Sequence, residues 1–219
     1  MVFIKNNSSI IFRSLLILSL LLIFVCISAY SYVSAVSYDI ASNVFRLHVI
    51  ANSDSKEDQD LKYLVRDSLL NYMNSITSDS STKQEAIDLA NEHINDFYKI
   101  AEETIKNAGY NYPVNITIGE YNFPTKQYGD VSLPAGTYDA LRVEIGSASG
   151  RNWWCVMFPP LCFVDVSSGI VPDDSKEMLQ DGLSDEEYDL ITTSDNSNDI
   201  NFKFKIIEFI EGLKIGLSK

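Results

Sequence analysis

The feature that most constrains this chain is an uncharged, strongly apolar stretch close to its N-terminus. Arg13 is followed by SLLILSLLLIFVCI, and the next charged residue is Asp39. A positive start followed by an apolar region is typical of a secretory signal or a signal-anchor helix, and the stretch exceeds the roughly 20 residues that cross a bilayer. Small residues up to Ala35 offer a cleavage site. We therefore expect residues 1–35 to be a signal peptide or signal anchor, and the sequence leaves open whether it is cleaved.

Charge and cysteine content agree with export. The chain of 219 residues carries 30 acidic and 17 basic side chains, a net charge of −13, which is too acidic for a nucleic-acid-binding protein. Its 46 % of hydrophobic residues exceeds what a disordered chain contains. Cys155 and Cys162 lie beyond the leader, with six residues between them. In an oxidising compartment such a pair is expected to form one disulfide.

The spacing of apolar residues predicts an α+β domain over residues 40–165. Strict alternation over residues 44–51 predicts a strand with one apolar face and one face that carries Arg46 and His48. Helical spacing predicts two long helices, at about 56–76 and 83–107, the second ended by a left-handed Gly109. Further strands are expected at 114–119, 123–132 and 138–145. This order predicts a small, mostly antiparallel sheet with the two helices on one face.

The C-terminal part has a different character. Between residues 165 and 199 eleven acidic residues face a single base, Lys176. We expect residues 166–200 to be an acidic linker with one helix near 174–191. Residues 201–219 have the apolar spacing of an amphipathic helix, which has three open roles: packing on the core, binding a partner helix, or lying on a membrane.

The motifs of common enzyme classes are missing. The sequence has no nucleophile elbow, zinc-protease motif or phosphate-binding loop, and no ligand cluster implies a metal or cofactor. An exported hydrolase or cell-wall-binding protein would use Cys155 as a thiolate and His48 as its base. No third group that would orient such a base is evident. The hydrolase or cell-wall-binding protein stays open as an alternative function.

Polar and aromatic residues at two places are candidates for binding a partner. They are Arg46, His48, Asn52, Asp54, Trp153 and Trp154. The first four combine a cationic strand face with a loop rich in hydrogen-bond acceptors, which could recognise a carboxylate or a backbone. The alternative is a strand face packed under a loop, with Arg46 paired to an acid. The two tryptophans are either core anchors or, if exposed, interface anchors.

Three separated blocks resemble the stage II sporulation protein R family. They are FRLHVIANSDSKEDQDLKYLVRD (residues 45–67), LPAGTYDALRVEIG (133–146) and NWWCVMFPPLCF (152–163). The resemblance covers about residues 45–165 and does not extend to the acidic linker or the C-terminal helix.

This resemblance implies a signalling role in endospore formation, and therefore a protein that is not an enzyme and has no small-molecule substrate. Such a protein is made in the forespore and exported across its membrane into the space between forespore and mother cell. There it is needed to activate a membrane-embedded aspartic protease, which processes the precursor of the early mother-cell sigma factor. The candidate residues would then contact that protease, and replacement of Arg46 or Trp154 would block activation without loss of folding.

Overall fold

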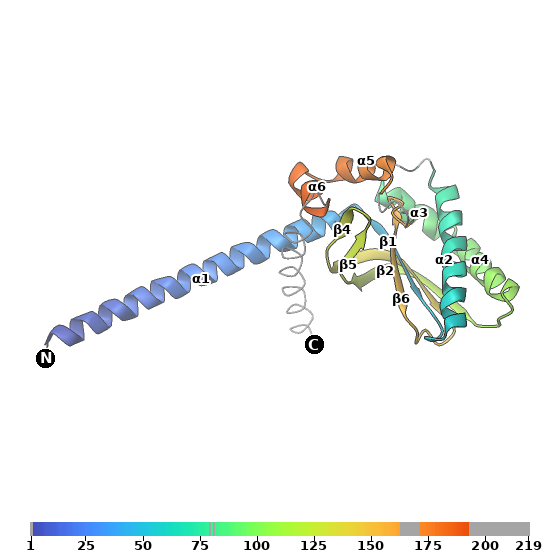
Figure 1. The fold of residues 1–219 in the computed structure, drawn as a ribbon. Helices are drawn as coiled ribbons and strands as arrows, with labels where there is room; N and C mark the ends of the chain where they lie inside the picture. Colours follow the sequence, from blue (N-terminus) through green and yellow to red (C-terminus); the bar gives the residue numbers. More distant parts are fainter. Residues whose placement is uncertain (1, 79, 81, 163–170, 193–219) are drawn as a thin grey trace. The chain divides into compact units, whose positions relative to one another are not determined.

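A computed structural model describes residues 2–78, 80, 82–162 and 171–192 (Figure 1). The chain divides into two compact units, Met1–Ser37 and Tyr38–Lys219. The first unit consists of helix α1 (Val2–Ser42), which continues into the second unit. Over Ser9–Ser42 this helix is, by length and composition, long and apolar enough to cross a membrane.

Three of the five described helices that begin in the second unit start at a capping side chain. The five are α2 (Lys56–Ile76), α3 (Lys83–Glu92), α4 (Ile94–Asn107), α5 (Asp173–Gly182) and α6 (Asp185–Ile191), and the three with a capping side chain are α2, α3 and α6. The Ser55 hydroxyl accepts a hydrogen bond from the Asp58 amide at the start of α2. Thr82 forms a complete capping box with Glu85 at the start of α3. The bounds of α2 agree with the prediction from helical spacing.

The single helix predicted over 83–107 is wrong, because the chain leaves helical geometry at His93. This residue has φ −97° and ψ 17°, and it ends α3 and precedes α4. Its ring nitrogen Nδ1 lies 2.9 Å from both the Tyr72 hydroxyl and an Asp96 carboxylate oxygen. The apolar spacing continues across the break, so the pattern alone does not reveal it. Gly109 follows α4 with φ +88°, as predicted for its terminator.

The strands form a four-stranded mixed sheet and a separate hairpin. They are β1 (Phe45–Ile50), β2 (Val114–Phe123), β3 (Lys126–Tyr128), β4 (Val131–Leu133), β5 (Gly136–Ile145) and β6 (Asn152–Phe158). The large sheet has the order β2-β5-β1-β6, in which β1–β5 is parallel and the other two pairings are antiparallel. The α+β fold with a mostly antiparallel sheet is therefore confirmed. The one strand predicted over 123–132 is instead divided between β2 and the β3–β4 hairpin.

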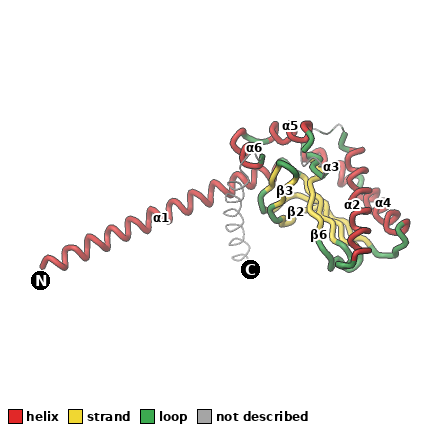
Figure 2. The backbone as a smooth tube through the Cα atoms, viewed as in Figure 1, coloured by secondary structure: helices red, strands yellow, loops and turns green. Residues whose placement is uncertain are grey.

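One face of the large sheet is covered by helices (Figure 2). Leu47 and Val49 of β1, Val143 of β5 and Met157 of β6 share a buried apolar cluster with residues of α2, α3 and α4. Alternation along the strands sends the neighbouring side chains to the opposite face. That second face carries the polar and aromatic side chains on which the candidate site is built.

Part of the acidic segment folds against the hairpin. The single helix expected near 174–191 is instead two helices, α5 and α6, in which Leu179 and Ile191 are fully buried. Lys176 of α5 forms a 2.5 Å ion pair with Asp130, and Thr192 forms a β-bridge to Val131. The amphipathic helix predicted over 201–219 lies outside the described residues.

Candidate partner-binding site

Arg46 lies at the centre of an aromatic cluster on the helix-free face of the sheet. The side chain is fully buried, and its Nη2 donates a 2.7 Å hydrogen bond to the Tyr128 hydroxyl. The guanidinium carbon is 4.1 Å from the ring centre of Phe123 and 4.6 Å from that of Tyr138. Among the described residues, its Nε and Nη1 have no hydrogen-bond partner. The negative faces of the rings, rather than a carboxylate, therefore stabilise this cation.

The imidazole of His48 extends the same cluster. It stacks on Trp154 with ring centres 3.7 Å apart and an angle of 18° between the planes. Its Nε2 lies 2.8 Å from the Asn152 side-chain oxygen. Burial lowers the pKa of His48 to about 4, although the hydrogen bond to the Asn152 side-chain oxygen acts in the opposite direction and raises it. The ring is therefore neutral at physiological pH, and Nε2 is the protonated donor in this contact.

These positions correct the view of Arg46 and His48 as an exposed cationic face. Both are buried, and Tyr128 of the β3–β4 hairpin contacts Arg46, which agrees with the alternative of a strand face packed under a loop. The acid that this alternative expected for Arg46 is replaced by Tyr128, a residue that the sequence pattern did not single out. Because Arg46 is fully buried, its replacement is expected to destabilise the fold, contrary to the prediction of a folded but inactive variant.

Asn52 and Asp54 join two loops at one end of the sheet. The Asn52 side-chain oxygen accepts a 2.9 Å hydrogen bond from the Ser147 amide, and its nitrogen donates a 2.8 Å bond to Asp58. Asp54 accepts a 2.8 Å bond from the Arg151 amide. These bonds connect the β1–α2 loop to the β5–β6 loop. Asn52 and Asp54 therefore position the start of β6, and a direct role in binding stays a prediction.

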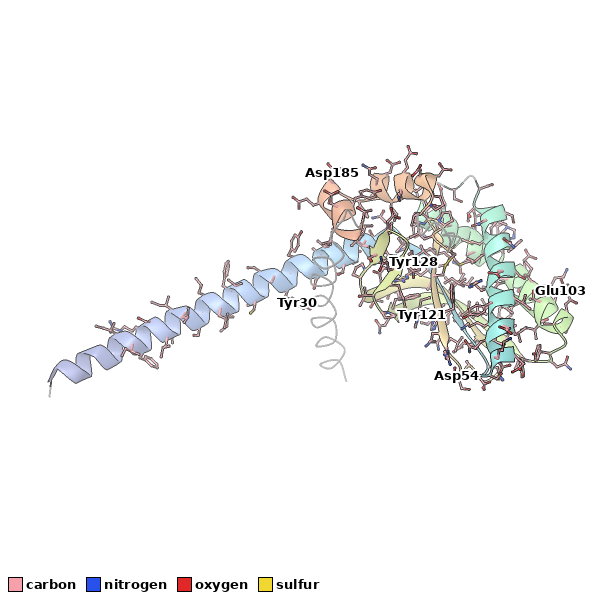
Figure 3. All side chains as sticks on the ribbon, viewed as in Figure 1. Tyr30, Asp54, Glu103, Tyr121, Tyr128 and Asp185 are labelled. Carbon is pink, nitrogen blue, oxygen red and sulfur yellow. A yellow bond between two sulfur atoms is a disulfide. The ribbon has the colours of Figure 1, made fainter. Side chains whose placement is uncertain are left out.

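A pocket of about 370 Å³ lies beside the start of β6. It is lined by Gln59, Lys62 and Tyr63 of α2, Lys126, Gln127 and Tyr128 of β3, and Arg151, Asn152, Trp153 and Trp154. Figure 3 labels Tyr128 on the hairpin and Asp54 just before α2. Both tryptophans are half-buried and line the pocket from successive positions of one strand. Of the six candidate residues, the structure brings only these two to the pocket.

The pocket contains a buried lysine that the sequence analysis missed. Lys62 is 1 % exposed, although it lies in an amphipathic helix where a lysine is normally solvated. Its Nζ donates to the Gln59 side-chain oxygen at 2.6 Å and to the Arg151 carbonyl at 3.2 Å. Burial lowers the pKa of Lys62, and the nearby charges of Arg151 and Arg66 lower it further. Lys62 stands between Leu61 and Tyr63, and the apolar spacing of α2 gave no signal that could have distinguished it from a solvated lysine.

The disulfide is present, and the alternative catalytic pair is not. Cys155 and Cys162 are bonded, with Cα atoms 5.5 Å apart. In the register of β1 and β6, Cys155 lies opposite Leu47 and His48 lies opposite Trp154. Successive side chains of a strand point to opposite faces, so Cys155 faces the helices and His48 faces the hairpin. A thiolate–imidazole pair is therefore incompatible with this sheet. No group of three or more His, Cys, Asp or Glu side chains in the described parts of the chain could hold a metal ion.

Comparison with known proteins identifies the family. The family model described as stage II sporulation protein R matches residues 41–168. The chain belongs to the stage II sporulation protein R family. Stage II sporulation protein R of Bacillus subtilis (strain 168) is 38 % identical over 130 residues, which are 59 % of this chain. The chain spans 58 % of the length of this relative. No solved structure matches the chain.

The match to the stage II sporulation protein R family includes every residue of the site. All strands of the large sheet, the β3–β4 hairpin and the pocket at β6 lie within residues 41–168. Helices α5 and α6 lie beyond the matched region. The matched region of this chain therefore contains the sheet with its pocket and helical layer.

Proposed function

We propose that this protein is an exported signal of endospore formation that acts by binding. In this proposal it crosses the forespore membrane and activates a membrane-embedded aspartic protease, which then processes the precursor of the early mother-cell sigma factor. The observation that carries the proposal is the match of the whole sheet to the stage II sporulation protein R family.

Two structural features support this role. Helix α1 has the length and hydropathy of a signal or membrane anchor, as export or tethering requires. The pocket at β6 combines aromatic side chains with polar groups, a composition typical of binding surfaces. The geometry gives no support to the hydrolase, because Cys155 is in a disulfide and His48 lies on the other face of the sheet.

The test is activation in a host that does not sporulate. The full chain would be expressed with the candidate protease and its sigma-factor precursor, and precursor cleavage would be followed by immunoblot. We expect cleavage that depends on this protein and that disappears when residues 1–35 are removed. A catalytically inactive protease is the control. Absence of cleavage, with all three proteins present and the protease correctly inserted, would overturn the proposal.

A further inference from the structure

The pocket at β6 lies at the edge strand of the sheet. β6 is the last strand in the order β2-β5-β1-β6 and, among the residues that the structure describes, pairs only with β1 in this sheet. Asn152 is exposed and Trp153 and Trp154 are half-buried, whereas the rest of the strand is buried. The accessible edge is therefore confined to the three residues that line the pocket. An open strand edge offers backbone donors and acceptors to an added strand.

The backbone of Trp154 points toward the pocket. The Tyr128 hydroxyl, which lines the pocket from the hairpin, donates a 3.2 Å hydrogen bond to the Trp154 carbonyl. The N–H and C=O groups of one residue in an antiparallel strand point to the same side. The Trp154 amide thus faces away from β1, and so do the backbone groups of Asn152, two residues earlier.

The side chains of the pocket are cations and hydrogen-bond donors. Lys62, Lys126 and Arg151 line it, and none of the described residues that line it is acidic. This composition contrasts with the net charge of −13 of the whole chain. One of these cations, Arg151, has an acidic neighbour: Asp54 lies 3.7 Å from its Nε and accepts a hydrogen bond from its backbone amide.

Two of the buried donors are suited to an anionic acceptor. Lys62 donates to two neutral oxygens and lies 4.8 Å from the centre of the Tyr63 ring, so within the described parts of the chain its ammonium group has no anionic partner among its hydrogen bonds. The indole Nε1 of Trp153 is buried and has no acceptor there. Arg66 is stacked 4.4 Å over the Trp153 ring, and its charge is paired with Asp67 at 2.6 Å, so Lys62, Lys126 and Arg151 are the cations that face the pocket. An anionic acceptor would satisfy these groups and relieve the repulsion between the cations.

We propose that this pocket binds an extended segment of a partner protein, paired along the β6 edge, with an Asp or Glu side chain directed at Lys62. The inference rests on the proposed function, because it treats the protein as one that acts by binding another protein. Beyond that function, it specifies the segment of the partner that is bound: an extended strand that carries an acidic side chain. The strand edge favours a peptide over an isolated anion, since an isolated anion makes no use of alternating backbone groups.

The experiment is a selection of twelve-residue random peptides, displayed on phage, on the full chain in non-ionic detergent micelles. We expect enrichment of peptides with an Asp or Glu flanked by β-branched or aromatic residues. A synthetic peptide from the selection should bind at least about tenfold more weakly when its acid is replaced by the corresponding amide.

Variants of the protein test the location. Lys62→Met keeps the apolar stem, and Lys126→Met removes a charge from the half-buried rim; each should weaken peptide binding by about tenfold. Lys99→Met, at an exposed position on α4, is the matched control and should bind normally. If Lys62 has only a structural role, Lys62→Met lowers the melting temperature and leaves affinity unchanged.

Three outcomes would overturn the proposal. These are selected peptides without acidic enrichment, equal binding by Lys62→Met, Lys126→Met and wild type, and a pocket that binds inorganic phosphate in place of the peptide. Peptide selection does not depend on the protease, so its result is separate from that of the activation assay. If wild type activates the protease and both lysine variants do so equally well, the proposed role of the pocket is refuted, whereas the proposed signalling function stands.

Discussion

Acidification is predicted to destabilise this protein through His48. The ring is 6 % exposed, stacks on Trp154 and has a pKa lowered from 6.5 to about 4, chiefly by burial. Among the charged groups that act on it, Arg142 lowers the pKa and Glu144 raises it. At neutral pH the ring is uncharged in both the folded and the unfolded chain, so its protonation does not lower the free energy of unfolding there.

The magnitude follows from the difference between the two pKa values. As the pH falls through 6.5, the unfolded chain binds a proton that the folded protein does not bind until about pH 4. At about 1.4 kcal/mol per pH unit, the free energy of unfolding falls by about 3 kcal/mol across this window. Carboxylates with lowered pKa values, such as Asp58, lose their contribution only below their ordinary value of 3.8.

The assay is urea unfolding of wild type and His48→Gln at a series of pH values. Both tryptophans of the chain lie in β6, so their emission reports the unfolding of this sheet. Between about pH 8 and about pH 4.5 the free energy of unfolding of wild type should fall by about 2.5 kcal/mol more than that of the variant, which lacks the titrating ring. The carboxylates affect both proteins equally, so their contribution cancels in this comparison. A difference between the two proteins that stays constant across this range would refute the burial of a neutral His48.

Three further predictions concern individual side chains. Gly146→Ala places a Cβ 2.2 Å from the Asn52 side-chain oxygen at φ +60°, so thermal unfolding should show a free energy of unfolding lower by about 3 kcal/mol or more. Gly109→Ala is the matched control: its φ is +88° but no atom lies within 4 Å of the new Cβ, so the loss should be about 1 kcal/mol. Equal losses for the two glycine variants would show that the contact with Asn52 is unimportant. Cys155→Ser and the double variant Cys155→Ser/Cys162→Ser should each lower the free energy of unfolding by about 2.5 kcal/mol, which is the loop-closure value for a short disulfide. A single variant that is much less stable than the double variant would contradict this account. Tyr128→Phe removes the hydrogen bonds to the buried arginine and to the Trp154 carbonyl, and should cost about 1–3 kcal/mol in chemical unfolding; an unchanged midpoint would mean that the aromatic rings alone hold the cation.

Local features of the chain were predictable from its sequence. Helix α2 begins at a Ser55 cap and carries a regular apolar spacing, and both are local signals that act over a few residues. The strand at β1 was predictable because its alternation persists in any sheet. The apolar leader was predictable because hydropathy and charge are properties of the sequence itself.

The site was decided by the tertiary structure. The sequence assigned Arg46 and His48 to one strand face but could not show that the β3–β4 hairpin covers it, because the contact between Arg46 and Tyr128 joins residues 82 positions apart. The opposite orientations of Cys155 and His48 depend on the register between β1 and β6, which is a pairing between distant segments. The same holds for the β6 pocket, whose lining comes from three separate stretches of the chain.

Lys62 shows the physical reason for this division most clearly. The helix that carries Lys62 could be predicted from the apolar spacing along the sequence. The burial of Lys62 depends on where α2 meets the start of β6, and its hydrogen bond to the Arg151 carbonyl joins residues 89 positions apart. Spacing along a chain determines which face of an element is apolar. Which polar groups become desolvated, and which of them then lack a partner, is determined only when distant elements pack together.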